Sequence, residues 1–126
     1  MIYGIGVDLA QISRIENAYN RFGQRFAERI LGKSELLDFA HTKRPVRFLA
    51  MRFAAKEAAS KAFGTGFKQG VAPRQIEVQH NRAGKPSLVF SGQAKKLAEE
   101  NVITASHVSL TDEDDFAVAY VILEIS

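Results

Sequence analysis

The sequence predicts an α+β fold, in which an antiparallel sheet packs against one long central helix and shorter N-terminal helices. An alternating strand pattern opens the chain, a run of helical patterns follows, and short hairpin-type strands dominate after residue 74. Strands and helices therefore occur in separate runs, without the regular βαβ alternation of a parallel sheet. The 126 residues contain no repeat or linker, so residues 1–126 are expected to form a single domain.

The first predicted strand covers Ile2–Leu9 and has two different faces. One face is apolar and consists of Ile5, Val7 and Leu9, and the other consists of Gly4, Gly6 and Asp8. Glycines inside a strand commonly mark close approach by another backbone or a ligand. We therefore expect free space beside the single carboxylate of Asp8. A helix-capping role for Asp8 is the less favoured alternative, because Ser13 and Glu16 match a capping box for the next helix.

Three short helices are expected next, over Arg14–Phe22, Gln24–Leu31 and Glu35 to about His41, the last of them capped by Ser34. If the first two are nearly collinear, four arginines form one basic stripe: Arg14, Arg21, Arg25 and Arg29. A solvated charged face is the commoner meaning of such a stripe. A docking surface for an acidic partner is the alternative, because residues 10–47 hold eight lysines and arginines against four carboxylates.

The long helix begins near Pro45 and ends at Gly64, since proline suits a first turn and glycine ends helices. It is apolar on all sides, which predicts burial, yet it carries Arg52, Lys56, Glu57 and Lys61. Buried charges need partners. The spacing of Glu57 and Lys61 allows an ordinary ion pair within the helix, and equally a pair of groups that serve a common site.

The remaining elements are a strand over Gln75–Gln79, a hairpin loop at residues 81–84, a strand over Pro86–Phe90, a helix over Gly92–Asn101, and a final antiparallel pair over His107–Thr111 and Phe116–Ile125. Zero cysteines exclude disulfides and thiolate chemistry. No run is long and apolar enough for a membrane span, and no leader-like segment follows Met1. We therefore expect a cytoplasmic protein.

Common nucleotide and zinc motifs do not fit this chain. Gly64-Thr65-Gly66 follows a helix instead of a strand and lacks the third glycine of a dinucleotide loop, and the three histidines lack ligand spacing. What remains is two carboxylates, Asp8 and Glu57, close to lysines and arginines. Carboxylates without histidine or thiolate suit Mg²⁺, and Arg52, Lys56 and Lys61 suit phosphates. The residues alone therefore indicate metal-assisted cleavage of a phosphate ester or anhydride.

At this point the chain resembles a known family. Two segments look like the paired motifs of the 4′-phosphopantetheinyl transferases, especially the small bacterial holo-acyl-carrier-protein synthases: Gly4-Ile5-Gly6-Val7-Asp8-Leu9 and Arg52-Phe53-Ala54-Ala55-Lys56-Glu57-Ala58-Ala59-Ser60-Lys61-Ala62-Phe63-Gly64-Thr65-Gly66. The likeness extends to residues 25–31, 84–86 and 107–109. It implies the fold of that family and transfer of phosphopantetheine from coenzyme A to a serine of an acidic apo acyl carrier protein, with release of 3′,5′-ADP. The modified carrier protein would then support fatty acid biosynthesis.

The resemblance also implies roles for single residues. Asp8 and Glu57 would bind Mg²⁺, and Lys61 would hold a phosphate and steady the leaving group. The nucleotide would be lined by Arg52, Gly64, Thr65, Gly66, Gly84, Lys85, Pro86 and His107. The family forms homotrimers with shared active sites, so the last four can serve a neighbour's site. Glu57, Glu35 and a metal-bound water, which we favour, are candidate bases for the serine proton, and the four arginines would steer the carrier protein.

Two other classes of function compete with this hypothesis. A nucleic-acid-binding module would use the arginine stripe on phosphates, but Asp8 and Glu57 would then repel its ligand. A non-catalytic oligomeric scaffold would use the charged helix to lock subunits together, and removal of Asp8 would then destabilise the protein. We favour the transferase and expect neither a nucleic acid nor a membrane as partner.

Overall fold

The computed structural model describes all 126 residues and contains five strands, five α-helices and one short 3₁₀ turn. Their order along the chain is β1 (Ile2–Gln11), α1 (Ile12–Phe22), α2 (Gln24–Ile30), α3 (Lys33–Phe39), α4 (Pro45–Phe63), η1 (Pro73–Gln75), β2 (Ile76–His80), β3 (Pro86–Phe90), α5 (Gly92–Glu100), β4 (Ile103–Glu113) and β5 (Phe116–Ile125). Both sheets are antiparallel, with strand orders β1-β5-β4 and β2-β3. The predicted α+β architecture is confirmed.

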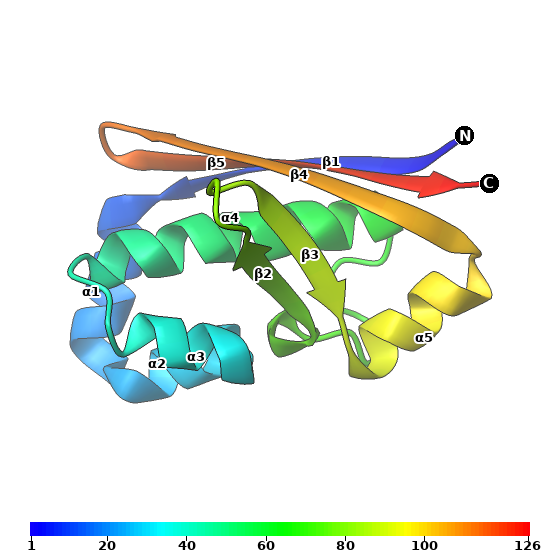
Figure 1. The fold of residues 1–126 in the computed structure, drawn as a ribbon. Helices are drawn as coiled ribbons and strands as arrows, with labels where there is room; N and C mark the ends of the chain where they lie inside the picture. The colour runs from blue at the N-terminus through cyan, green and yellow to red at the C-terminus, as the bar shows by residue number, and fades with distance from the viewer.

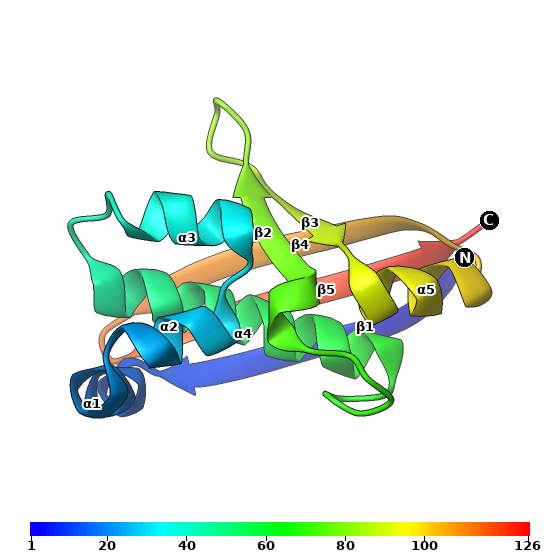
Figure 2. The same cartoon turned by 90° about the horizontal axis from the view of Figure 1, so that it is seen from below.

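One face of the three-stranded sheet is covered and the other is bare. Figure 1 shows α4 running beneath the sheet, with the β2-β3 hairpin and the other helices on that same side. Figure 2 shows the hairpin crossing α4 and its tip extending past the body of the chain. α4 is buried over most of its length, as its all-round apolar composition predicts. None of the helices combines the length and hydropathy needed to cross a bilayer.

The glycine face of β1 packs directly on the backbone of α4. A Cβ added to Gly6 would lie 1.9 Å from the carbonyl oxygen of Ala58, and one added to Gly4 would lie 1.9 Å from that of Ala62. Only glycine permits this spacing, because any side chain would push the two elements apart. The sequence-based expectation of close approach at these glycines is thus confirmed, and the approaching group is a helix backbone.

The apolar face of β1 points away from α4 and remains exposed. Ile5, Val7 and Leu9 are 56%, 45% and 61% exposed. On the same outer face of the sheet, their cross-strand partners on β5 continue the apolar surface: Val118, Tyr120 and Ile122. We call these six residues the outer apolar face. The inner partners on β5 are buried instead: Ala117, Ala119, Val121 and Leu123.

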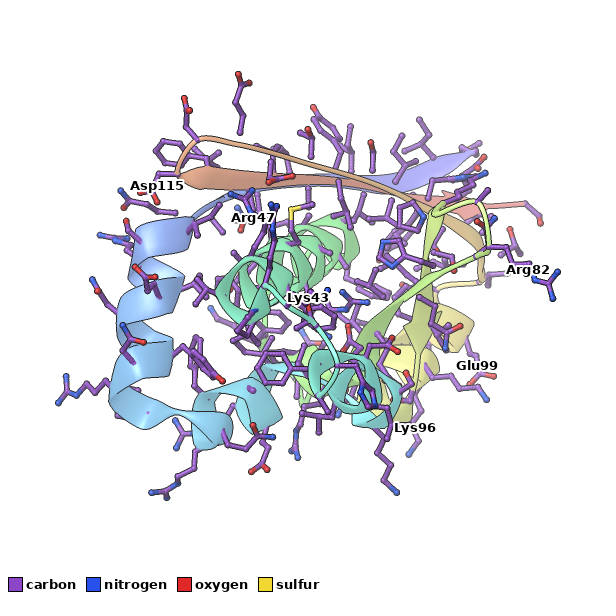
Figure 3. All side chains as sticks on the ribbon, turned by 60° about the vertical axis from the view of Figure 1, so that its left-hand side comes forward. Lys43, Arg47, Arg82, Lys96, Glu99 and Asp115 are labelled. Atoms are coloured by element: carbon purple, nitrogen blue, oxygen red, sulfur yellow. The ribbon has the colours of Figure 1, made fainter.

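The N-terminal helices differ from prediction in their caps and in their course. The first turn of α1 is held by Asp115 of the β4-β5 turn, which accepts hydrogen bonds from the backbone N–H of Ser13 (2.9 Å) and from its hydroxyl (2.6 Å). Figure 3 shows Asp115 above the start of α1. The predicted capping box of Ser13 and Glu16 is therefore wrong, because a residue distant in sequence supplies the acceptor.

α1 and α2 meet at a corner. Gly23 adopts φ 61° between them, and the two helices run in clearly different directions in Figures 1 and 3. A single straight arginine stripe is therefore wrong. α3 starts at Lys33, one residue before the predicted cap, and the Ser34 hydroxyl instead donates to Glu77 of β2 (2.6 Å).

Candidate active site

Asp8, Glu57 and Lys61 meet where the middle of β1 crosses the C-terminal half of α4. The Lys61 ammonium lies 3.0 Å from Oδ1 of Asp8 and donates a second hydrogen bond to the carbonyl oxygen of Val7 (3.1 Å). Lys61 forms its ion pair with Asp8 and not with Glu57. The four-residue spacing of Glu57 and Lys61 therefore does not produce an ion pair within the helix. The contact joins residues 53 positions apart.

The second carboxylate, that of Glu57, lies in an environment that disfavours its negative charge. Partial burial, and then the nearby negative charge of Asp8, raise the pKa of Glu57, and the positive charge of Lys61 offsets only part of this. Two carboxylates therefore share one cation that lies on Asp8. A second positive charge placed between the two carboxylates would therefore be stabilised by both of them.

The glycine loop after α4 lies next to this cluster, whereas the other predicted nucleotide residues lie elsewhere. Gly64 and Gly66 have φ values of 87° and 60°, and the N–H of Gly66 returns to the carbonyl oxygen of Ser60 (3.1 Å). The conformation turns the chain sharply just after Lys61. In the exposed β2-β3 turn, the N–H of Lys85 donates to the side chain of Asn81 (2.9 Å), and Gly84 has φ 88°.

Pro86 pairs with His80 at that end of the hairpin. His107 stands opposite Ile122 on the outer face of the sheet and contacts Glu124, whereas Asp8 stands opposite Ala119 on the inner face. β1 and β4 are also the two edge strands. His107 and Asp8 of one chain are therefore separated by the full width and thickness of the sheet.

A buried ionic network occupies the other flank of α4. Glu35 and Lys56 are both fully buried, with Nζ of Lys56 2.6 Å from Oε1 of Glu35, and Arg52 places Nε 3.2 Å from Oε2. Lys56 also donates to the carbonyl oxygens of Pro73 (3.1 Å) and Ile76 (2.6 Å). Lys56 cannot reach a phosphate, and Glu35 cannot serve as a base for an incoming serine. The expectation that Lys56 suits a phosphate is therefore wrong, and Glu35 is removed from the three candidate bases, because the partners of both residues lie inside the protein.

Arg52 borders a basic cavity that the sequence analysis missed. The cavity has a volume of about 240 Å³, and its charged or titratable lining residues are Arg44, Arg47, Arg52 and His80. The guanidinium of Arg52 lies 3.8 Å above the ring of Phe48. Burial, and then the positive charge of Arg52, lower the pKa of His80. Lys43, Arg44 and Arg47 place three cations around the start of the predicted helix. This local density of positive charge is the sequence signal that indicates an anion site here.

The four predicted docking arginines are all exposed but form two groups. Arg14 and Arg21 lie on α1, and Arg25 and Arg29 lie on α2 after the corner at Gly23. Arg25 and Arg29 line a cavity of about 400 Å³ together with Phe22 and Phe26. The pair on α2 therefore frames an apolar recess with positive charge.

The chemistry available here is that of phosphates. A carboxylate pair with one exposed lysine offers a place for a hard divalent cation, which prefers oxygen ligands. The basic cavity offers an independent place for an anion. Arg52 and Glu57 are five residues apart on α4, so they project at angles roughly 140° apart, toward opposite flanks. One chain thus displays two features that suit phosphates, and they lie on opposite flanks of α4.

Comparison with known proteins identifies the family of this chain. The family model of the 4′-phosphopantetheinyl transferase superfamily matches residues 4–121. The holo-[acyl-carrier-protein] synthase of Vibrio cholerae serotype O1 is 52% identical over 124 residues, which cover 98% of both chains. The crystal structure of the enzyme from Neisseria meningitidis has a TM-score of 0.94 at 44% identity and covers 98% of this chain and 99% of that chain.

A structure of the Bacillus anthracis holo-(acyl-carrier-protein) synthase in complex with CoA (3′,5′-ADP) has a TM-score of 0.85 at 40% identity, covering 100% of this chain and 99% of that one. The chain therefore belongs to the 4′-phosphopantetheinyl transferase superfamily. About half of its residues are identical to those of holo-[acyl-carrier-protein] synthases over nearly the whole length. The chain is therefore an enzyme of the holo-[acyl-carrier-protein] synthase type within that superfamily.

Proposed function

We propose that this enzyme transfers the 4′-phosphopantetheine group from coenzyme A to a serine of apo acyl carrier protein, in a Mg²⁺-dependent reaction that releases 3′,5′-ADP. Residues 1–126 act as one transferase domain, in the cytoplasm, in support of fatty acid biosynthesis. The observation that carries this proposal is the pairing of Asp8 with the exposed Lys61, with Glu57 close enough for the charges of both to act on its carboxylate. In transfer of a phosphoryl-linked group, the protein mainly positions charges, and these three residues are charges of that kind.

The donor set suits magnesium. Asp8 is 15% exposed and Lys61 is 52% exposed, so the pair is open to solvent and Lys61 can leave Asp8. No three histidine, aspartate or glutamate side chains converge on one point in the chain. Two carboxylates alone suit Mg²⁺, which keeps several waters and takes further ligands from substrate phosphates. Bound there, the ion would neutralise charge on the pyrophosphate of coenzyme A.

Lys61 is the residue that would act on the departing group. The serine oxygen forms a bond to the phosphorus next to pantetheine, the bond from that phosphorus to the bridging oxygen breaks, and the serine proton passes to a water molecule in the open site. Negative charge then accumulates on 3′,5′-ADP. An ammonium group released from Asp8 can follow that charge, whereas Asp8 and Glu57 stay fixed on β1 and α4. Glu35 is excluded as the proton acceptor by its burial.

Coenzyme A also carries a 3′-phosphate, and the basic cavity suits it. Arg44, Arg52 and His80 face a space of about 240 Å³. Arg47 lines the same space but forms an ion pair with Asp112. The cavity and the carboxylate pair lie on opposite flanks of α4, so one coenzyme molecule would use the cavity of one subunit and the carboxylates of another. The outward position of His107 supports the same arrangement, as would a contribution from Gly84, Lys85 and Pro86 to a neighbour's site.

The outer apolar face supports a homotrimer with active sites at the subunit interfaces. Exposed apolar surface that is continuous over two strands marks a contact with another protein. Tyr120 lies near its centre and is 48% exposed, opposite Val7. Packing of three copies through these faces would bury them and would bring edge strands of neighbouring subunits together.

Carrier docking would use the arginines of α1 and α2. The carrier protein is acidic in this family, and Arg14, Arg21, Arg25 and Arg29 are exposed. The recess between Phe22 and Phe26 would accept an apolar carrier side chain, while Arg25 and Arg29 would pair with carboxylates around it. Exposed charges around a docking site, such as those of Arg25 and Arg29, raise the association rate more than the final affinity, and salt screens them.

The direct test is the intact mass of apo acyl carrier protein after incubation with the enzyme, coenzyme A and Mg²⁺. A mass gain of one phosphopantetheine group is expected, and a chelator should abolish it. Asp8→Ala and Glu57→Ala should each lower the rate at least about a hundredfold. Glu99→Ala is the matched control, because Glu99 projects from α5 into solvent (Figure 3). No mass gain with folded wild-type enzyme would refute the function, and a gain unaffected by both substitutions would refute the site.

A further inference from the structure

The buried network of Glu35, Arg52 and Lys56 carries a surplus positive charge. Glu35 and Lys56 are fully buried and already neutralise each other at 2.6 Å. Arg52, 6% exposed, adds a second cation against the same carboxylate. Asp38 and Glu77 lie close enough to act on Arg52 and Lys56, respectively, but neither makes an ion pair with them. A buried cation in excess requires an anion from elsewhere.

The contacts of the two cations show that the surplus resides on Arg52. Lys56 has three N–H donors and three acceptors within 3.1 Å, so its bonding capacity is filled. Arg52 donates one long hydrogen bond to the carbonyl oxygen of Val78 (3.4 Å), and its Nε–H does not point at any acceptor. Its guanidinium rests on the ring of Phe48 at the wall of the basic cavity. Arg52 is therefore held in place with donors to spare.

Glu35 holds the side chain of Arg52 in this position. Oε1 accepts from the N–H of Gly32 and from Lys56, and Oε2 accepts from the N–H of Val78 (3.0 Å) and lies 3.2 Å from Arg52. One carboxylate thus joins the start of α3, the middle of α4 and strand β2, and the last two of these elements contribute Arg52 and His80 to the lining of the cavity. Three hydrogen bonds hold this carboxylate, so Glu35 cannot rotate away from Arg52 without breaking them.

We propose that Glu35 is a positioning residue for coenzyme A, which fixes Arg52 at the cavity for the 3′-phosphate, while Lys56 only balances its charge. This inference rests on the proposed function. Loss of Glu35 would leave two buried cations that repel each other, so Arg52 would turn toward solvent. Recognition of the 3′-phosphate would then weaken, whereas the carboxylate pair on the opposite flank of α4 would keep its geometry.

The test compares binding of coenzyme A and dephospho-coenzyme A, which lacks only the 3′-phosphate, by calorimetry without carrier protein. The wild-type enzyme should bind coenzyme A more tightly by about tenfold or more. Glu35→Gln should remove most of this preference and lower the melting temperature. Glu35→Gln combined with Lys56→Met restores charge balance, so the melting temperature should recover while the preference stays lost. Lys56→Met alone, the matched control, should keep the preference.

Several outcomes would overturn the proposal. A double variant that regains the preference together with its stability would show that Glu35 serves folding alone. Equal loss in the Lys56→Met control would point to general disturbance of the network. Arg52→Gln removes the surplus cation and should abolish the preference in a folded protein, so a preserved preference there also refutes the assignment. Failure of the wild-type enzyme to modify any carrier protein would instead refute the underlying function.

Discussion

Replacement of Gly6 by alanine would test whether backbone contact between β1 and α4 sets the geometry of the active site. The added Cβ would stand 1.9 Å from the carbonyl oxygen of Ala58 and 2.9 Å from the backbone nitrogen of Ala62. Ordinary contact begins near 3.4 Å, so strand and helix must separate by roughly 1.5 Å. Neither neighbour is a flexible side chain that could yield. The separation therefore falls on the elements that carry Asp8 and Glu57.

The cost has a thermodynamic and a catalytic part. Overpacking of a tight interior contact costs about 1–3 kcal/mol, and a rigid backbone neighbour favours the upper limit. For a chain of this size, about 3 kcal/mol lowers the melting temperature by roughly 10 °C. Displacement of Asp8 by more than 1 Å would break its 3.0 Å contact with Lys61. Misplacement by about 1 Å can cost roughly a hundredfold in rate.

Thermal melting measures the loss of stability, and the carrier mass assay, run well below the lower of the two melting temperatures, measures the loss of activity in folded protein. Gly4→Ala is the matched control, since its clash with Ala62 is as close but lies near the end of α4, where the helix can shift. We expect Gly6→Ala to lose more activity than Gly4→Ala at equal folded fraction. Wild-type melting and wild-type turnover in Gly6→Ala would refute the reasoning.

Three further predictions concern separate parts of the molecule. Tyr120→Asp should give a folded monomer by light scattering and should lose activity, and a persistent trimer would contradict the outer-face assignment. Since burial and Arg52 lower the pKa of His80, the free enzyme carries a neutral His80 at pH 7, and a bound phosphate should favour its protonation. The Kd for coenzyme A should then decrease as pH falls from neutrality, because binding of the phosphate takes up a proton at His80, and this trend should be weaker in His80→Gln. Identical slopes would exclude His80 from the cavity's anion site. Asp115→Ala should lower the melting temperature and raise KM for carrier protein but not for coenzyme A, whereas equal changes in both would show a general defect.

Local patterns predicted the elements well because the relevant signals are short. Pro45 and Gly64 mark the ends of α4, and both hairpin strands of the second sheet lie within one residue of their predicted bounds. The alternation in β1 also predicted its two faces and their glycines. It could not show that the apolar face is the exposed one, because alternation reveals that the two faces differ and does not reveal which of them packs on the long helix.

The candidate site was predictable only in part, for reasons of distance along the chain. Asp8 and Glu57 were identifiable by residue type and by family resemblance, and the structure brings them together. Partners far apart in sequence were not identifiable: Glu35 lies 21 residues from Lys56, and Asp115 lies 102 residues from Ser13. A local capping pattern at Ser13 was therefore misleading, and the buried lysine was mistaken for a phosphate ligand.

The filled hydrogen-bond shell of Lys56 has a consequence for the chemical reactivity of this enzyme. Two lysines five residues apart on α4 differ completely in access, since Lys56 is fully buried and Lys61 is 52% exposed. Amine-acylating reagents need a free, unprotonated lysine nitrogen, so they would modify Lys61 and leave Lys56 untouched while the fold is intact. Acylation of Lys61 would remove the only cation on Asp8 and inactivate the enzyme, whereas label on Lys56 would report that α3 and α4 have separated.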